Sequence, residues 1–138
     1  GLAEGVAVGL PVVSPEGIVG LVIQTTSHSA KVMLITDPTS AVDALVLNSR
    51  ARGIVKGGLS GFCDLQYMLH KYEIKVGDTV VSSGMDGVFP KGVPVGKVTS
   101  IASQESGIFQ SIAVTPFVDF NRLEEVLVVP AHHESSPS

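Results

Sequence analysis

Short apolar runs rich in Val and Ile alternate with turns that contain Gly or Pro along nearly the whole chain. Runs of this length with such turns between them are typical of strands, and no helix-period pattern of ten or more residues is present. The pattern predicts an all-β fold of the barrel or sandwich type, with short helical turns only after Asp37-Pro38 and at residues 121–125. The expected strands are 11–13, 18–23, 31–35, 44–47, 53–55, 79–81, 93–98, 110–114 and 126–129.

A weak internal repeat relates the two halves of the chain. Residues 8–14 read Val-Gly-Leu-Pro-Val-Val-Ser and residues 76–82 read Val-Gly-Asp-Thr-Val-Val-Ser, and a glycine-rich hairpin and a Val-Gly-x-Val strand follow each copy. Two units of similar plan predict two small β-barrel subdomains side by side, over residues 1–70 and 71–130. The pattern does not fix which strands pair, so an exchange of strands between the units stays open. Residues 131–138 lack apolar periodicity and are expected to be disordered.

Composition narrows the classes of partner. Charged residues make up 16% of the 138 residues, the net charge is -4 and the mean hydropathy is +0.39. An acidic chain without a concentrated basic face is a poor candidate for nucleic-acid binding. No apolar run approaches the roughly 18 residues of a membrane span, so the apolar content suits strands or a surface that meets a partner. The start at Gly1, without Met or a signal peptide, indicates part of a longer protein.

Cys63 is the only cysteine of the chain. Alternation places Cys63, Leu65 and Tyr67 on one face of an expected strand, so we interpret Cys63 as a small core residue. The four histidines lack neighbours at metal-ligand spacing, and no phosphate-binding loop is present. The sequence therefore predicts neither a metal site nor a cofactor.

One enzymatic alternative follows from the expected pair of barrels, the chymotrypsin-like hydrolases. His28, then Asp37 or Asp43, then Ser82 or Ser83 stand in the order of that catalytic triad. The run Ser-Ser-Gly-Met-Asp-Gly around the serines does not reproduce the family's Gly-Asp-Ser-Gly turn. A third alternative, a barrel that binds a small molecule, would require a lined cavity of several hundred Å³.

Several segments resemble the MreC family of bacterial rod shape-determining proteins. Residues 28–42 are similar to its strand that ends in Thr-Asp-Pro-x-Ser-Ala-Val, and residues 52–57 to its Arg-Gly-Ile-x-x-Gly. Residues 76–98 resemble its long hairpin, Val-Gly-Asp-x-Val-x-Thr-Ser-Gly followed by Gly-Ile-Phe-Pro-x-Gly-x-Pro-x-Gly, and residues 123–129 its ending. The departures are mild: Ser82 for Thr, Met85-Asp86 for Leu-Gly and Val88 for Ile.

The resemblance implies a pair of small β-barrels without catalytic residues. It implies a scaffold of the elongation machinery, which maintains rod shape by organising peptidoglycan synthesis through protein–protein contacts. The domain would stand on the extracytoplasmic, periplasmic face of the cytoplasmic membrane, with its parent anchored by one N-terminal transmembrane helix. The implied partners are further copies in a dimer or filament, the elongation class B penicillin-binding protein, MreD and other membrane proteins of the rod complex. Neither nucleic acid nor a small-molecule substrate is expected.

Five hydrophobic residues at or near expected loops are candidates for partner contacts: Phe62, Tyr67, Met68, Leu69 and Phe89. The alternative for each is a place in the core. For Phe89, in a loop of Gly and Pro, the favoured reading is a plug at the end of its own barrel.

Overall fold

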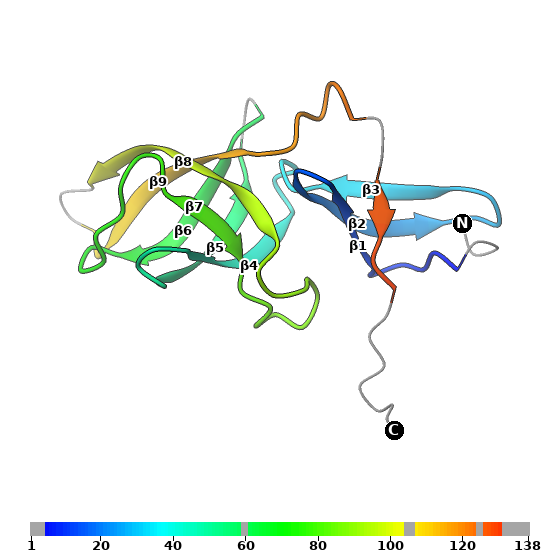
Figure 1. The fold of residues 1–138 in the computed structure, drawn as a ribbon, viewed down its shortest axis with the longest axis horizontal. Coiled ribbons are helices and arrows are strands. Elements are labelled where there is room, and N and C mark those ends of the chain that lie inside the picture. The colour runs from blue at the N-terminus through cyan, green and yellow to red at the C-terminus, as the bar shows by residue number, and fades with distance from the viewer. Residues whose placement is uncertain (1–4, 59–60, 104–106, 124–125, 131–138) are drawn as a thin grey trace.

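The computed structural model describes residues 5–58, 61–103, 107–123 and 126–130, and it shows a closed barrel beside an open sheet (Figure 1). All of the regular structure in these residues is β, as the apolar pattern predicts. The strands are β1 (Pro11–Ser14), β2 (Gly17–Thr25), β3 (Ala30–Leu34), β4 (Ala41–Val46), β5 (Arg52–Gly57), β6 (Cys63–Leu69), β7 (Thr79–Ser82), β8 (Pro94–Ser103), β9 (Phe109–Pro116) and β10 (Leu127–Val128).

The closed barrel has the strand order β4-β5-β6-β9-β8-β7, and all of its pairings are antiparallel. Inward-facing β-branched and aliphatic side chains fill it, among them Val55, Leu65, Val98 and Ile112, each almost fully buried. Alternation along each strand sends every second side chain into this core, which is why the Val- and Ile-rich runs form strands.

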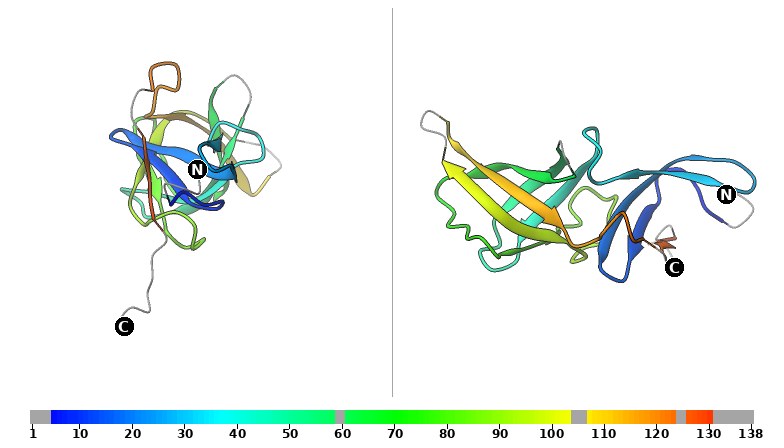
Figure 2. Two further views of the ribbon diagram at one scale, coloured as in Figure 1. Left: turned by 90° about the vertical axis from the view of Figure 1, so that its right-hand side faces the viewer. Right: turned by 90° about the horizontal axis from the view of Figure 1, so that it is seen from above.

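The open sheet has the order β10-β1-β2-β3 and a small core of its own. It stands at one end of the barrel, and its β2–β3 hairpin projects away from the barrel (Figure 1 and Figure 2). Ile18 of β2 packs into the barrel core. A Cβ on Gly17 would lie only 2.4 Å from the carbonyl oxygen of Pro94, so β2 and β8 approach as closely as backbones allow.

The expected division between residues 70 and 71 runs through the barrel instead of between two barrels. β6, before this point, pairs with β9, and β4 pairs with β7. The strand exchange that the sequence left open is therefore extensive. A three-stranded meander has two free edges and one apolar face, so two meanders from different parts of the chain close a barrel that neither forms alone. The other expected barrel is the open four-stranded sheet.

The internal repeat is visible in three dimensions, because β1–β2–β3 and β7–β8–β9 are the same meander. Val12 lies opposite Gly20, and Val80 lies opposite Gly96. The register shifts at the same places in both copies, at 12/13 and 80/81 between the first two strands and at 22–24 and 98–100 between the second and third.

Hydrogen bonds outside the ladders repeat as well. The N–H of Gly9 donates to the carbonyl of Val22 at 2.8 Å, and that of Gly77 donates to Val98 at 2.8 Å. Both glycines need positive φ angles, 95° and 98°, which a residue with a Cβ rarely adopts. The repeat is thus a repeat of backbone geometry and not only of residue types.

The expected alternation along β6 is wrong beyond Leu65. A bulge between Leu65 and Met68 inserts an extra residue into the strand. Tyr67 therefore turns outward with φ 66°, and Met68 takes its place in the core. Cys63 and Leu65 are buried as expected.

Neither expected helical turn is a helix in the part of the chain described. The carboxylate of Asp37 accepts hydrogen bonds from the N–H of Thr39 at 2.9 Å and from its hydroxyl at 2.7 Å, and Ser40 N–H donates to the Asp37 carbonyl. Asp37 therefore caps a tight turn that leads into β4. In the second turn, the N–H of Arg122 donates a hydrogen bond to the carbonyl of Asp119. Glu124, Glu125 and the tail 131–138 lie outside the described residues.

Candidate interaction surfaces

The residues considered for a hydrolase triad are engaged in separate local structures. His28 lies in the β2–β3 turn, where its N–H donates to the hydroxyl of Thr26, and this turn is the part of the sheet that points away from the barrel (Figure 1). The hydroxyl of Ser82 is buried, donates to the carbonyl of Pro90 and accepts from the N–H of Val93. Ser82 thereby fastens the base of the long hairpin between β7 and β8.

The remaining triad candidates also have structural partners. The hydroxyl of Ser83 accepts the N–H of Met85 at 3.1 Å. Asp43 forms an ion pair with Arg52 at 3.1 Å on the barrel exterior. Asp37 caps its turn, and hydrogen bonds from the backbone and side chain of Thr39, assisted by the charge of Lys31, lower the pKa of its carboxyl.

The cysteine is enclosed by the barrel. The thiol of Cys63 donates to the carbonyl of Ile35 at 3.4 Å. Burial, and to a smaller extent the neighbouring Asp64 carboxylate, raises the pKa of this thiol to about 12. Among the described residues, no group of three His, Cys, Asp or Glu side chains is placed to hold a metal ion.

The five expected contact residues separate into surface and core. Tyr67 and Phe62 are exposed, at 55% and 49%, and Leu69 is half-buried. Met68 and Phe89 are buried, at 0% and 5%, and belong to the barrel core, so they leave the set of contact candidates. For Phe89, burial in the barrel core agrees with the core alternative that the sequence favoured.

Tyr67 belongs to an exposed apolar patch that we call the Tyr67–Phe109 patch, formed by Tyr67, Leu69, Ile108 and Phe109. The rings of Tyr67 and Phe109 meet edge to face with centroids 5.5 Å apart. Leu69 is paired with Phe109 across β6 and β9, and Ile108 is 67% exposed. The side-chain amide of Gln110 donates to the carbonyls of Leu69 and Tyr72, at 2.9 and 2.7 Å, which fixes the end of β6 beneath the patch.

Two residues of this patch, Ile108 and Phe109, are not among the expected contact residues. Both precede a β-branched run at the start of an expected strand, where a hydrophobic residue is ordinarily read as core. The polar Gln110 could have indicated the exposure of Ile108, since residues two apart in a strand share a face, but no local signal marks Phe109.

The hairpin between β7 and β8 forms a second exposed apolar site. Met85 and Val88 point outward there, while Phe89 turns into the barrel. The carboxylate of Asp86 accepts the N–H groups of Val88 and Phe89, at 3.0 and 3.2 Å, and also the N–H of Asp43 on β4. These hydrogen bonds tie the loop to the barrel wall.

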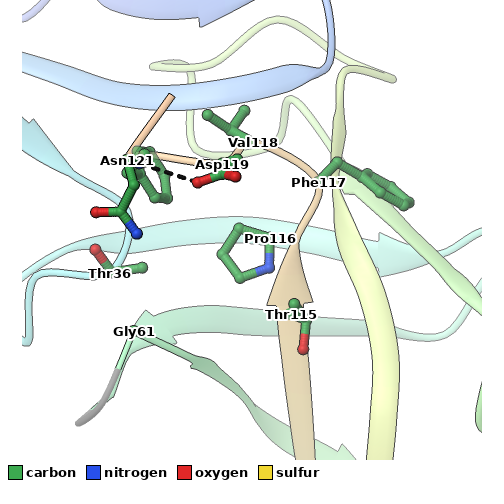
Figure 3. Close-up of a pocket in the computed structure, with 9 residues that line it drawn as sticks. Thr36, Gly61, Thr115, Pro116, Phe117, Val118, Asp119 and Asn121 are labelled. Atoms are coloured by element: carbon green, nitrogen blue, oxygen red, sulfur yellow. Dashed lines mark hydrogen bonds between the residues drawn. The ribbon is translucent and has the colours of Figure 1, made fainter. Parts of the chain in front are cut away.

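An open pocket of about 380 Å³ lies between the barrel and the open sheet (Figure 3). Most of its lining comes from residues 115–121, which leave β9 towards the sheet, together with Thr36 and Gly61. Its carboxylate, Asp119, accepts the N–H of Asn121 at 3.0 Å and so serves a turn. The pocket has the size expected for a small-molecule site, but it lies outside the barrel, whose interior is filled with apolar side chains.

The described residues contain no helix with the length and hydropathy of a membrane span.

Known proteins resemble this chain along most of its length. A family model described as rod shape-determining protein MreC, barrel core, matches residues 1–130. The cell shape-determining protein MreC of Escherichia coli (strain K12) is 34% identical over 130 residues, which are 94% of this chain and 35% of that protein. The chain thus spans about a third of this relative. The crystal structure of MreC from Pseudomonas aeruginosa has a TM-score of 0.90 at 33% identity, over 94% of this chain and 84% of that one.

Two more distant solved structures share the fold. One is a complex between a penicillin-binding protein and MreC from Helicobacter pylori, with a TM-score of 0.74 at 22% identity, over 88% of this chain and 76% of that one. The other is the major periplasmic domain from the cell shape-determining filament MreC, with a TM-score of 0.73 at 18% identity, over 86% of this chain and 75% of that one.

Proposed function

The chain belongs to the MreC family of rod shape-determining proteins, and from this premise we propose that it is a non-catalytic scaffold of the bacterial elongation machinery. It organises peptidoglycan synthesis by contacts made on its exterior, because its barrel interior is filled with apolar side chains. The curated relatives are cell shape-determining proteins, and this chain corresponds to about a third of the Escherichia coli relative.

The proposed partner is the elongation class B penicillin-binding protein. The support from relatives is the Helicobacter pylori complex, in which an MreC chain is bound to a penicillin-binding protein. The support from this chain, and the observation that carries the proposal, is the Tyr67–Phe109 patch. Aromatic side chains that are exposed in the free protein and already held in place are the usual anchors of protein interfaces, because little conformational entropy is lost when they bind.

We extend the proposal to location and to further partners. The domain works on the periplasmic side of the cytoplasmic membrane, in a parent anchored by one transmembrane helix, where it also associates with further copies, with MreD and with other rod-complex proteins. The support is that a distant relative with this fold is a major periplasmic domain from a filament. These assignments are tested by fractionation and cross-linking of the full-length protein in its host.

A direct binding measurement tests the proposed function. The chain is immobilised, and the periplasmic part of its host's elongation class B penicillin-binding protein is titrated over it at 50 and 500 mM salt. We expect saturable binding whose affinity changes by less than about three-fold between the two salt concentrations, because an apolar aromatic contact is screened little. A division-specific penicillin-binding protein is the control. Equal binding of both proteins, or of neither, contradicts the proposal.

A further inference from the structure

Strand β3 forms one edge of the open sheet, and no described strand pairs with its outer side. The N–H of Ile35 donates to the carbonyl of Val19 on β2, at 3.0 Å. In an antiparallel pair, successive residues alternate between bonding to the partner strand and facing away from it. The backbone groups of Ala30 and Val32 therefore face away from β2. Such an edge is able to accept another strand.

The internal repeat indicates what kind of strand fits this edge. In the second copy of the meander, β9 stands where β3 stands in the first, and β9 carries β6 on its outer side. The matching register shifts make Val32 equivalent to Val114 and Lys31 equivalent to Ala113. The two residues that β6 places there are Cys63 opposite Val114 and Asp64 opposite Ala113.

The side chains of β3 define the chemistry of the missing strand. Val32 and Leu34 pack against the core of the open sheet but remain partly exposed, so an added strand with apolar residues on this face would complete their burial. Lys31 projects from the opposite face and is exposed. In the barrel, β6 occupies the equivalent edge, and opposite Ala113, the equivalent of Lys31, it carries the acidic residue Asp64.

From these observations we propose that the edge of β3 is a docking site for an extended segment of a partner protein, in which an acidic residue stands between two apolar ones. The segment adds to the sheet antiparallel to β3, with its apolar residues beside Val32 and its carboxylate opposite Lys31. This site lies on the open sheet and is separate from the Tyr67–Phe109 patch on the barrel, so it goes beyond the contact proposed above.

The charge on β3 favours a partner segment over a second copy of the chain. If two β3 edges paired around Val32, Lys31 of one copy would lie opposite Met33 of the other, and the two Lys31 side chains would be diagonal neighbours. Like charges at this spacing weaken a pair of strands, whereas a carboxylate directly opposite Lys31 strengthens it.

The test uses two labelled peptides and three variants of the chain. One peptide alternates valine with aspartate, and the other has lysine in place of each aspartate; binding is followed by fluorescence anisotropy at low salt. Lys31→Glu reverses the charge on the edge. Val32→Pro removes an outward N–H without removing a bond to β2. Lys97→Glu, on the exposed face of β8, is the control because it changes the net charge equally.

We expect the parent chain to bind the aspartate peptide, and Lys97→Glu to change that affinity by less than about two-fold. Lys31→Glu should weaken it by about three- to ten-fold and make the lysine peptide the better ligand. Val32→Pro should weaken both peptides by at least about ten-fold, since it blocks strand addition. A melting curve checks that Val32→Pro is folded. If it is not, the change of preference from the aspartate to the lysine peptide in Lys31→Glu still tests the proposal.

Three outcomes overturn the inference. One is no binding of the aspartate peptide, in which case Lys31 only protects a bare edge. Another is an affinity for the aspartate peptide that neither Lys31→Glu nor Val32→Pro changes. The third is a concentration-dependent dimer in sedimentation that Val32→Pro abolishes, without peptide binding, because the edge then holds a second copy. The assay contains no penicillin-binding protein, so its failure leaves the proposed scaffold function standing.

Discussion

Tyr67 holds its ring outside the barrel by means of a backbone conformation that few non-glycine residues adopt. Its φ of 66° arises at the bulge where β6 inserts an extra residue against β9. Such a conformation costs on the order of 1–3 kcal/mol and persists only where the surroundings enforce it. Here the buried Leu65 and Met68 on either side enforce it. The same bulge therefore fills the core with Met68 and exposes an aromatic side chain on the surface of the barrel.

The burial of Cys63 predicts that its thiol is chemically unreactive. The pKa of about 12 leaves almost no thiolate at neutral pH, and thiolate is the reactive form. We expect iodoacetamide at pH 7.5 to alkylate the folded chain at least about 100-fold more slowly than the urea-unfolded chain, as measured by mass spectrometry. Rapid modification of the folded protein would show that the thiol is accessible and contradict its place in the core.

Among the strands, the two copies of the meander depend on glycine at one equivalent position. A Cβ on Gly20 would lie 2.0 Å from the carbonyl oxygen of Met33, and a Cβ on Gly96 would lie 2.4 Å from that of Thr115. The crowding atoms are backbone atoms of the next strand, which cannot turn aside. The glycine in each Val-Gly-x-Val sequence thus allows the second and third strands of the meander to approach closely beside the bulges.

We predict that Gly20→Ala and Gly96→Ala each destabilise the chain by about 3 kcal/mol or more, since overpacking against backbone is relieved only by moving a strand. Gly58→Ala is the control, because its nearest contacts would be 3.2 Å away, and it should cost less than about 1 kcal/mol. Urea unfolding measures all three. Equal effects of the three substitutions would mean that the meanders tolerate a side chain at Gly20 and Gly96.

The sequence predicted the strands well where local residue types determine them. β-branched runs between Gly and Pro turns located nine of the strands to within a few residues, since strand formation there needs only an apolar face and a turn. The bulge in β6 was not predictable, because Gln66 and Tyr67 include no glycine to mark it. As a result, strict alternation places Tyr67 on the core face, whereas the bulge turns it outward.

In the molecule as a whole, the repeat predicted two related units but not how the barrel closes. β6 joins β9, and β4 joins β7, between segments far apart in the chain. Such pairings depend on which faces and edges remain free after each meander has formed, and no local pattern of residues records this. Ile108 and Phe109 escaped prediction for the same reason, since the β6–β9 pairing brings this end of β9 beside Tyr67 and Leu69.

The proposed scaffold binds its partners through the exterior of the barrel, and the apolar interior only stabilises the fold. The most direct test measures the affinity of the Tyr67→Asp variant for the elongation class B penicillin-binding protein, together with its melting temperature. Asp accepts a positive φ more readily than Tyr, so the change removes the ring without straining the bulge. Val8→Asp, which is equally exposed but lies near the open sheet, is the control.

We predict that Tyr67→Asp weakens binding at least about ten-fold, as expected of an aromatic anchor, while its melting temperature stays within about 3 °C of the parent chain. Val8→Asp should bind as the parent does. Unchanged affinity in folded Tyr67→Asp would contradict the assignment of the Tyr67–Phe109 patch as the scaffold's contact surface.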